Sequence, residues 1–385
     1  MTPRSTQTPR APRRHRVLFA GGGTGGHVYP AIAIAEAVRD HVPGTTVSFA
    51  GTQDRLEWTA VPKAGYPIHP ITVTGFPRSL SPKLFTFPLK LTKGLRQSLD
   101  LVRSFDPDVV VGTGGYVSGP VLWAASRLGR PIVIQEQNAY AGLTNKLLAK
   151  RATRIHVAFE AAIEAFGRPE VCVMSGNPTR PALQTATRAA GRKHFDLPHD
   201  AEVLFMFGGS LGSQALNEAM HVHAPRLLER ENRYLIWQTG RRYFERLDTP
   251  ETHHPRLRLL KYVDRMDLAY KAADLTLCRA GAISCSELMV TGTPSVLVPS
   301  PNVTADHQTK NARAMVGGGA SVLLVESSLS AALSTTIDAL FADPSRLAAM
   351  SAAALGMARP NASADIAADV LSLAAGYAET NRRTA

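Results

Sequence analysis

The sequence has little cysteine, few aromatic residues and no long uninterrupted apolar run. Its 385 residues include only three cysteines, Cys172, Cys278 and Cys285, and none of them has CxxC spacing. This argues against a disulfide framework or a zinc site and fits a reducing cytoplasm. Aromatic residues make up 6% of the chain. No aromatic and basic stripe or known nucleic-acid-binding module is present, which argues against a nucleic-acid binder.

The longest uncharged stretches do not predict a membrane span. They cover residues 17–35, 109–126 and 288–305, and each is broken by glycine and proline. Such stretches are typical of buried strands followed by loops and helix starts. Any contact with a membrane is therefore expected to be peripheral.

Acidic residues are outnumbered by basic ones, 31 against 43, which gives a formal net charge of +12. This excess favours an acidic partner: nucleic acid, an anionic membrane surface or a phosphate-bearing substrate. Part of it lies in an arginine-rich segment before residue 17. That segment has no apolar core, so we expect a disordered basic tail over residues 1–15 and no secretory signal.

One pattern occurs twice along the chain. An apolar strand at 17–20 leads into glycines at 21–26 and a helical segment at 30–39. A second strand at 203–207 leads into glycines at 208–213 and a helix that runs through residue 220. Each half of the chain thus opens with a strand, a glycine turn and a helix.

Further apolar strands alternate with helices in both halves, which predicts parallel sheets covered on both faces. Two such units in tandem predict two Rossmann-like domains, with a boundary near residues 176–181. An alanine-rich helix over 362–377 is expected to pack back on the first domain. The expected strands cover 46–50, 109–111 and 132–134, then 234–237, 257–260, 275–277 and 295–298.

Glycine turns between a strand and a helix can hold phosphate, because the helix start offers free N–H groups and a positive dipole end. No GxxxxGK[ST] loop is present. A third candidate follows the strand at 274–278. There Glu287 lies near the start of a helix, where it either accepts ribose hydroxyls or only complements the helix dipole. Downstream, Gln308 and Asn311 are candidate sugar ligands.

Seven motifs, in order along the chain, resemble those of the MurG family of peptidoglycan N-acetylglucosaminyltransferases. The match extends from residue 16 to about residue 373. The motifs are GGTGGHVYP at 22–30, GGYVSGP at 114–120, EQN at 136–138 with AGLTNK at 141–146, GNPTR at 176–180, GGS at 208–210 with Asn217, GAISCSE at 281–287 and DHQTKNA at 306–312.

The resemblance implies an α/β chain of the GT-B class, with two Rossmann-like domains whose parallel sheets face a central cleft. It implies an acceptor- and membrane-binding domain at 16–177 and a UDP-N-acetylglucosamine-binding domain at 178–360. A C-terminal helix and tail follow at 361–385. The activity it implies is transfer of N-acetylglucosamine from UDP-N-acetylglucosamine to lipid-linked muramyl-pentapeptide, at the cytoplasmic face of the cell membrane.

The resemblance also implies roles for individual residues. The backbone of Val263 would read the uracil, and Glu287 would bind the ribose. Arg180 would help the helix N–H groups hold the diphosphate, and Gln308 would bind the sugar. The full set of substrate-binding residues is Thr24, Gly25, Gly26, Asn138, Arg180, Ser210, Val263, Ala282, Ile283, Ser284, Cys285, Ser286, Glu287 and Gln308.

Three positions depart from the family pattern. Gln135 stands where histidine often precedes the EQN motif, and Cys278 and Ala280 stand where serines often flank Arg279. These departures concern individual contacts and leave the overall resemblance intact.

The implied reaction needs a base for the acceptor hydroxyl and stabilisation of the leaving diphosphate. His27 is the first candidate base, since an imidazole with a pKa near 6.5 suits this role; alternatively it only caps the helix or orients a phosphate. Glu136 is the rival base. No DxD motif appears in a suitable loop, so we expect inverting transfer without a metal or other cofactor.

A lipid-linked acceptor requires membrane contact. Residues 75–94 mix apolar and basic side chains, as expected for an anionic interface; the alternative is a face that packs inward. Trp123, Lys146, Lys150 and Arg151 extend the candidate patch. Its apolar residues in this segment are Phe76, Leu80, Leu84, Phe85, Phe87 and Leu89.

Two other functions remain open from sequence. One is a GT-B transferase with a soluble acceptor, against which the interfacial patch argues. The other is a nucleotide-sugar sensor, which would need neither His27 nor an acceptor cleft.

Overall fold

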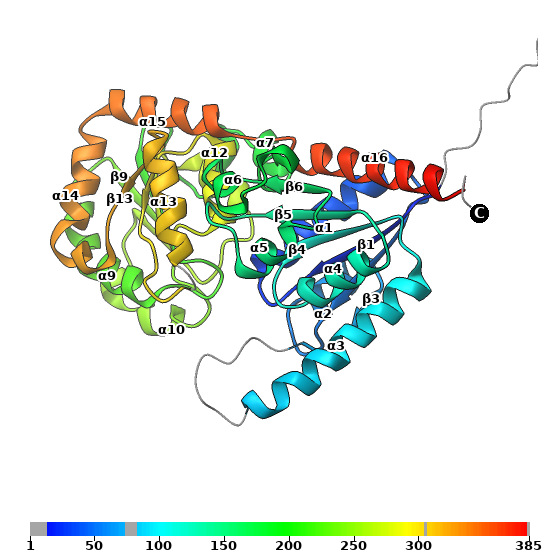
Figure 1. Cartoon of the computed structure of the whole chain (residues 1–385). Helices are drawn as coiled ribbons and strands as arrows, with labels where there is room; N and C mark the ends of the chain where they lie inside the picture. Colours follow the sequence, from blue (N-terminus) through cyan, green and yellow to red (C-terminus); the bar gives the residue numbers. More distant parts are fainter. Residues whose placement is uncertain (1–13, 74–82, 304–305, 383–385) are drawn as a thin grey trace, which may run out of the picture.

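Two parallel sheets, one in each half of the chain, form the frame of the molecule (Figure 1). In this computed structural model, residues 14–73, 83–303 and 306–382 are described, with the backbone alone for 83–87 and 381–382. The predicted α/β architecture with two Rossmann-like domains is confirmed.

The first sheet has seven strands in the order β3-β2-β1-β4-β5-β6-β7. Each neighbouring pair is parallel. Its strands are β1 Arg16–Gly21, β2 Thr46–Gly51, β3 Ile68–Pro70, β4 Val109–Gly114, β5 Ile132–Glu136, β6 Arg154–Val157 and β7 Cys172–Met174. Its helices are α1 Gly25–His41, α2 Glu57–Lys63, α3 Lys83–Phe105, α4 Ser118–Arg127, α5 Leu143–Ala149 and α6 Ala161–Phe166, followed by the 3₁₀ turn η1 Pro169–Val171.

The second sheet has six parallel strands in the order β10-β9-β8-β11-β12-β13. Its strands are β8 Glu202–Phe207, β9 Arg233–Gln238, β10 Leu257–Leu260, β11 Leu275–Cys278, β12 Ser295–Leu297 and β13 Ser321–Leu323. Its helices are α7 Ala182–Thr185, α8 Arg188–His194, α9 Gln214–Leu228, α10 Phe244–Leu247, α11 Met266–Ala272, α12 Ala282–Thr291, α13 His307–Gly317, α14 Leu329–Phe341 and α15 Pro344–Met357, with 3₁₀ turns η2 Pro250–Thr252 and η4 Glu326–Ser328.

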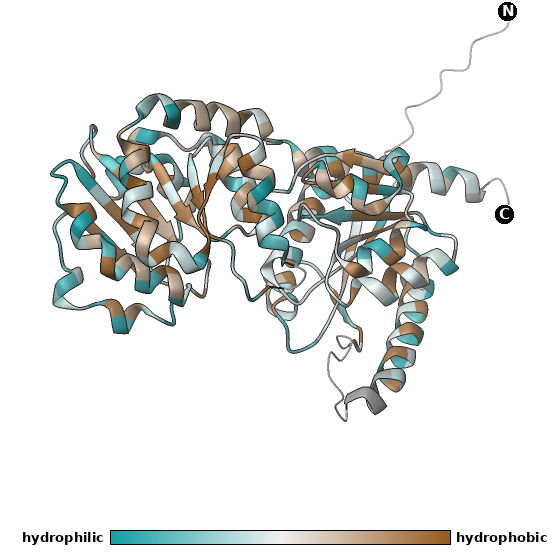
Figure 2. Cartoon of the chain, turned by 60° about the vertical axis from the view of Figure 1, so that its left-hand side comes forward, coloured by the Kyte–Doolittle hydropathy of each residue, from teal (hydrophilic) through white to brown (hydrophobic). Residues whose placement is uncertain are grey.

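The central strands β1 and β8 are apolar over most of their length. In β1, Val17 to Ala20 are fully buried, and Val203 to Met206 in β8 are buried in the same way. A strand without polar alternation needs cover on both faces, and the helices supply it. Figure 2 shows apolar strands inside each half and hydrophilic helix faces outside.

In both sheets the strand order changes side at the first strand, which is β1 in one sheet and β8 in the other. The chain builds outward on one side of β1 and then crosses to β4 on the other, and β8 and β11 repeat this crossing. Ligands of such sheets bind at the carboxyl ends of the strands beside the reversal. The glycine loops after β1, β4, β8 and β11 all lie at these positions.

The chain crosses between the two halves twice. It first passes through residues 175–181, between β7 and α7. It returns after α15, and the last helix, α16 Ala362–Arg382, runs back along the first half beside α1 (Figure 1). Ile366, Val370 and Ala374 of α16 are fully buried in the core that α1 shares with the first sheet.

Four short strands, β3, β6, β7 and β13, were not among the expected strands. The first helix also begins earlier than expected, at Gly25 and not at Pro30. Gly23 has a φ of +87°, which completes the turn before Thr24. Gly25 and Gly26 therefore belong to the first turn of α1 and not to the loop.

Candidate functional site

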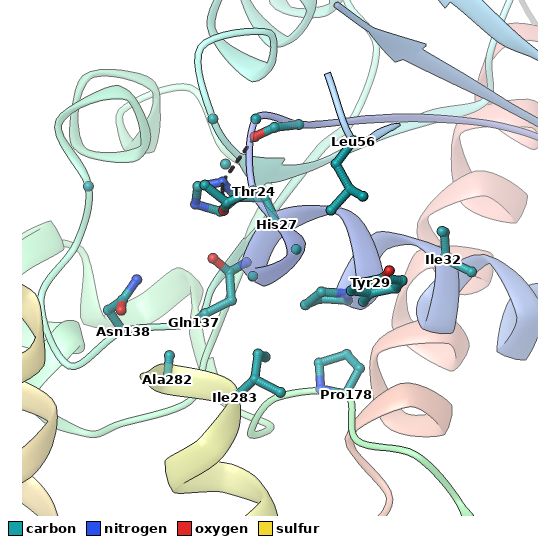
Figure 3. A pocket seen from close by; sticks show the side chains of 18 of the residues that line it. Thr24, His27, Tyr29, Ile32, Leu56, Gln137, Asn138, Pro178, Ala282 and Ile283 are labelled. Atoms are coloured by element: carbon teal, nitrogen blue, oxygen red, sulfur yellow. Dashed lines mark hydrogen bonds between the residues drawn. The ribbon is translucent and has the colours of Figure 1, made fainter. Parts of the chain in front are cut away.

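A cleft of about 2850 Å³ lies between the two halves and is lined by both. From the first half come the loops after β1, β4 and β5. From the second half come the loops after β8 and β9 and the start of α12. In Figure 3, Thr24 and His27 lie on one side of this cleft, and Ala282 and Ile283, at the start of α12, lie on the other.

The first glycine loop is held by a buried carboxylate. Glu57, in α2, is fully buried, and its Oε2 accepts the Gly23 N–H at 2.9 Å. Its Oε1 accepts the Thr52 N–H at 3.1 Å, which ties the loop after β1 to the end of β2. These two hydrogen bonds fix the orientation of the loop.

The second glycine loop packs directly on the first. Gly115 has a φ of +80°, and a Cβ at this position would lie 2.3 Å from the Gly22 carbonyl oxygen. The Thr113 hydroxyl donates to the His27 carbonyl oxygen at 2.8 Å, which joins β4 to α1. Only glycine at 115 allows the two loops to approach so closely.

His27 has one ring nitrogen engaged and the other at the cleft. Its Nδ1 lies 3.1 Å from the Gly22 carbonyl oxygen, which can only accept, so Nδ1 carries the proton. The Thr24 hydroxyl lies 3.3 Å from the same nitrogen. Nε2 is then the unprotonated nitrogen. Its side of the ring approaches Gly114, where a Cβ would lie 3.0 Å from Nε2.

Burial lowers the pKa of His27 below its usual value. The Gly22 carbonyl and the Glu136 carboxylate oppose this shift because both favour the protonated ring, whereas His307 adds to it. His27 is thus neutral near pH 7, with Nε2 able to accept a proton.

Glu136 is buried and fully engaged within its own loop. Its Oε1 accepts the N–H and the side-chain amide of Asn138, at 3.1 and 3.2 Å. Its Oε2 accepts the Gly142 N–H at 3.0 Å and the Asn145 amide at 2.8 Å. These four hydrogen bonds leave the Glu136 carboxylate oxygens engaged within the loop.

The start of α12 offers free donors to the cleft. Among the hydrogen bonds of the described residues, none uses the N–H groups of Ala282, Ile283 or Ser284; the first intrahelical bond runs from Cys285 N–H to the Gly281 carbonyl. No acidic side chain lies in the first turn. This end of α12 is suited to bind an anion.

Glu287 is a buried carboxylate at the same end of α12. The Tyr270 hydroxyl donates to its Oε2 at 3.0 Å, and Arg180 Nε lies 4.0 Å from its Oε1. Burial raises the pKa of Glu287, and the Arg180 charge and the Tyr270 hydrogen bond oppose that shift. The arrangement can accept hydrogen bonds from a ligand's hydroxyl groups.

Gln238, at the end of β9, joins two loops of the second half. Its Oε1 accepts the Val263 N–H at 2.8 Å, and its Nε2 donates to the Gly209 carbonyl oxygen at 3.1 Å. The Val263 N–H is therefore occupied by a side chain in the structure. Any ligand that uses this N–H must displace Gln238.

Comparison with known proteins places this architecture in one family. The amino-terminal domain of glycosyltransferase family 28 matches residues 17–157, and the carboxyl-terminal domain of the same family matches residues 203–369. The chain belongs to glycosyltransferase family 28.

Curated relatives of this family 28 chain share one name, UDP-N-acetylglucosamine–N-acetylmuramyl-(pentapeptide) pyrophosphoryl-undecaprenol N-acetylglucosamine transferase. The protein from Salinibacter ruber is 54% identical over 95% of this chain and 98% of its own length. The one from Chlorobium limicola is 43% identical over 93% and 99%. The crystal structure of MurG from Acinetobacter baumannii is 29% identical, covers 94% of this chain and all of its own, and has a TM-score of 0.76.

Most of the residues predicted for the site line the cleft of this family 28 chain. They are Thr24, Gly25, Gly26, His27, Glu136, Asn138, Arg180, Ser210, Val263, Ala282, Ile283, Ser284 and Glu287.

Cys285, Ser286 and Gln308 are placed away from the cleft wall. Cys285 is fully buried in the core, and the Ser286 hydroxyl accepts from Asn177 at 2.9 Å. The Gln308 Oε1 accepts the Ser300 N–H at 2.8 Å, whereas His307, one residue earlier, lines the cleft. The predicted contact of Gln308 with a sugar stays a prediction.

Sequence reasoning missed several residues that shape this family 28 site. Glu57 holds the first glycine loop, and Tyr270 holds the Glu287 carboxylate. Gln238 holds the loop that carries Val263. Of these, Gln238 alone carried a usable signal, because it ends a parallel strand, where ligands of such sheets gather. Glu57 and Tyr270 lie within helices, and nothing in their local sequence marks them.

The protonation state of His27 is directly measurable. Because burial lowers its pKa, we expect His27 to be neutral at pH 6.5 and to take up its second proton only at lower pH. Its ring should be the Nδ1-protonated tautomer. NMR of ¹⁵N-histidine-labelled protein, with His27→Gln to assign the signal, checks both. A His27 ring half-protonated above pH 6.5 would contradict this account.

Proposed function

We propose that this chain transfers N-acetylglucosamine from UDP-N-acetylglucosamine to a lipid-linked muramyl-pentapeptide, the step that forms the peptidoglycan disaccharide. The names of its relatives support this proposal. The observation that carries it is the pairing of a buried Glu287 and a free α12 start on one side of the cleft with a neutral His27 on the other.

The donor fits the second half. The ribose hydroxyls donate to Glu287, whose burial strengthens these hydrogen bonds. The diphosphate oxygens accept hydrogen bonds from the N–H groups of Ala282, Ile283 and Ser284. The loop that carries Ser210 lies next to the diphosphate. Arg180 adds a positive charge next to Glu287. The uracil meets the Val263 backbone once the Gln238 side chain moves aside.

The sugar then lies between the two halves, near Asn138 and Thr24, with its anomeric carbon toward His27. The acceptor 4-hydroxyl attacks this carbon, its proton passes to His27 Nε2, and the bond to the diphosphate breaks as UDP leaves. Attack from the face opposite the leaving group inverts the anomeric centre. Glu136, fixed by its four donors, stabilises the imidazolium that forms.

We further propose that the leaving UDP needs no metal ion. The charge that develops on its diphosphate meets the positive end of the α12 dipole and the Arg180 guanidinium. Both are preorganised in the structure, since the α12 start and the Arg180 side chain already line the cleft.

The acceptor enters from the first half, where Leu91, Leu95, Trp123 and Leu147 are among the residues that line the cleft. Leu143 and Leu147 lie one helical turn apart on α5 and are 74% and 70% exposed. Lys150 and Arg151 are exposed beside them. We propose that this face contacts an anionic membrane and admits the lipid.

Of the apolar residues predicted for the membrane in segment 75–94, Leu89 has a described side chain, which is 73% exposed on α3. Phe76 and Leu80 lie outside the described residues, and the side chains of Leu84, Phe85 and Phe87 are not described either. Within the part of the chain that the structure describes, no helix is both long and apolar enough to cross a bilayer. A peripheral position at the cytoplasmic face of the cell membrane therefore stays part of the proposal.

A transfer assay tests the donor site and the base together. Glu287→Ala should raise the KM for UDP-N-acetylglucosamine at least about tenfold, because it removes charged hydrogen bonds. His27→Ala should lower kcat by about 10² to 10⁴ with little change in UDP affinity. Transfer by the unaltered chain should persist in EDTA.

Glu218→Ala, an exposed glutamate on α9 outside the cleft, is the matched control and should behave as the unaltered chain. Near-normal turnover of His27→Ala would contradict the proposal that His27 is the catalytic base. If UDP binds but no sugar moves to this acceptor, a transferase with another, soluble acceptor becomes the better reading.

Vesicle flotation tests the membrane face. The double substitution of Leu143 and Leu147 by serine should weaken binding to anionic vesicles by at least about tenfold, because two leucines no longer insert. Val222→Ser, which removes a 69% exposed valine from α9, is the control. Equal flotation of all three proteins would contradict the proposed face.

A further inference from the structure

A single peptide group connects the buried Glu57 carboxylate to the His27 ring. The Gly23 N–H, at one end of this group, donates to Glu57 Oε2 at 2.9 Å. The Gly22 carbonyl oxygen, at its other end, accepts from His27 Nδ1 at 3.1 Å. In a trans peptide group the N–H and the carbonyl point in opposite directions. Carboxylate, peptide group and imidazole therefore form one chain of hydrogen bonds, which begins in α2 and ends at the cleft.

The first glycine loop leaves room for this carboxylate. Glu57 is fully buried beside the loop. A Cβ at Gly22 would collide with Glu57 Oε1, and a Cβ at Gly51 would lie 2.8 Å from Glu57 Cγ. A larger residue at either position would therefore displace the carboxylate from the loop.

The charge of Glu57 is not needed to hold the loop. A buried carboxylate is stable only where hydrogen bonds replace water, and the N–H groups of Gly23 and Thr52 do so here. A neutral glutamine could also accept the Gly23 N–H. The negative charge therefore calls for a second role, and it lies at one end of the hydrogen-bond chain that reaches His27.

A charge at the start of this chain acts on the ring at its end. Hydrogen bonds in a chain polarise one another at a buried site, so the carboxylate makes the Gly22 carbonyl a stronger acceptor. The carbonyl keeps the proton on Nδ1 of His27 and leaves Nε2 free to accept. When Nε2 takes up a proton, the ring becomes a cation, which the same chain stabilises.

The His27 ring also responds to the charges around it. Burial lowers the pKa of His27, and the hydrogen bond to the Gly22 carbonyl opposes this shift. The charges of Glu136, after β5, and Glu57, on α2, also favour the protonated ring, whereas His307, on α13, disfavours it. Loss of the Glu57 charge should therefore lower the pKa of His27 further.

We propose that Glu57 is a positioning residue for the sugar transfer and acts on His27 through the peptide group between them. This inference rests on the proposed function, in which His27 is the base. The proton of the acceptor hydroxyl passes to Nε2, Nδ1 keeps its own proton, and the Glu57 carboxylate neither gains nor loses one. Glu57 thus orients the ring and stabilises the imidazolium without touching either substrate.

Steady-state kinetics of Glu57→Gln test this role, because glutamine keeps the size of the side chain and removes its charge. We expect kcat to fall about tenfold, since the hydrogen-bond chain to the developing cation loses its charged end. The KM of each substrate should change by less than about twofold. The acidic limb of the kcat–pH profile should move to lower pH, because the pKa of His27 falls. Glu160→Gln, at an exposed glutamate before α6, is the matched control.

A double-mutant cycle separates action through His27 from a structural effect. In the His27→Ala background, Glu57→Gln should leave kcat unchanged, because the ring on which the charge acts is gone. Glu57→Asp, which keeps the charge on a shorter side chain, should retain more activity than Glu57→Gln. A loss of kcat that is equal in the two backgrounds would show that Glu57 only holds the loop and would overturn the proposal.

NMR of ¹⁵N-labelled protein tests the same connection without requiring transfer. In the unaltered chain, the Gly23 amide signal should shift as His27 takes up its second proton, and His27→Gln should abolish this shift. The Gly115 amide is the control, because Gly115 packs on Gly22 outside the hydrogen-bond chain. A Gly23 signal that does not follow His27 would overturn the proposal, and this measurement needs no variant of Glu57.

The same spectra of Glu57→Gln provide the last comparison. The pKa of the His27 ring should be lower in this variant than in the unaltered chain, and Glu160→Gln should leave it unchanged. A His27 titration that is the same with and without the Glu57 charge would overturn the proposal, whether or not the chain transfers sugar.

Discussion

The site depends on a seam of buried amide groups between the two domains. Asn177 lies between the sheets and is almost fully buried. Its Oδ1 accepts the Gln135 amide at 2.8 Å, and its Nδ2 donates to the Gln137 carbonyl at 3.0 Å and to the Ser286 hydroxyl at 2.9 Å. Buried amides must find partners, so this seam specifies one relation of the domains. Gln135, which departs from the family pattern, supplies one of its donors.

This seam explains why neither half forms a site alone. Asn177 joins the end of β5 to α12, and Asn311 joins α13 to the loop after β5. The free start of α12 is thereby set opposite His27, whose pKa is lowered by burial. In the proposed reaction the donor half contributes charge stabilisation and the acceptor half contributes the base.

Local features of the site could be predicted from sequence, and contacts across the seam could not. The strand, glycine loop and helix units are local, so His27 and Glu287 were predicted. The hydrogen bond between Ala139 and Asn311 joins residues that are 172 positions apart in the sequence. Such a contact produces no periodic pattern in the sequence. The sugar-binding role of Gln308 stays a prediction. His307 shares its helix face with Asn311, four residues on, while Gln308 turns toward Ser300.

The most direct test of this account is a crystal structure of the chain with UDP-N-acetylglucosamine bound. The account predicts ribose hydroxyls on Glu287, the diphosphate at the start of α12 and the sugar between the domains. Gln238 should have released the Val263 N–H, and the anomeric carbon should face His27. A sugar directed away from His27, or a diphosphate bound elsewhere than at α12, would contradict it.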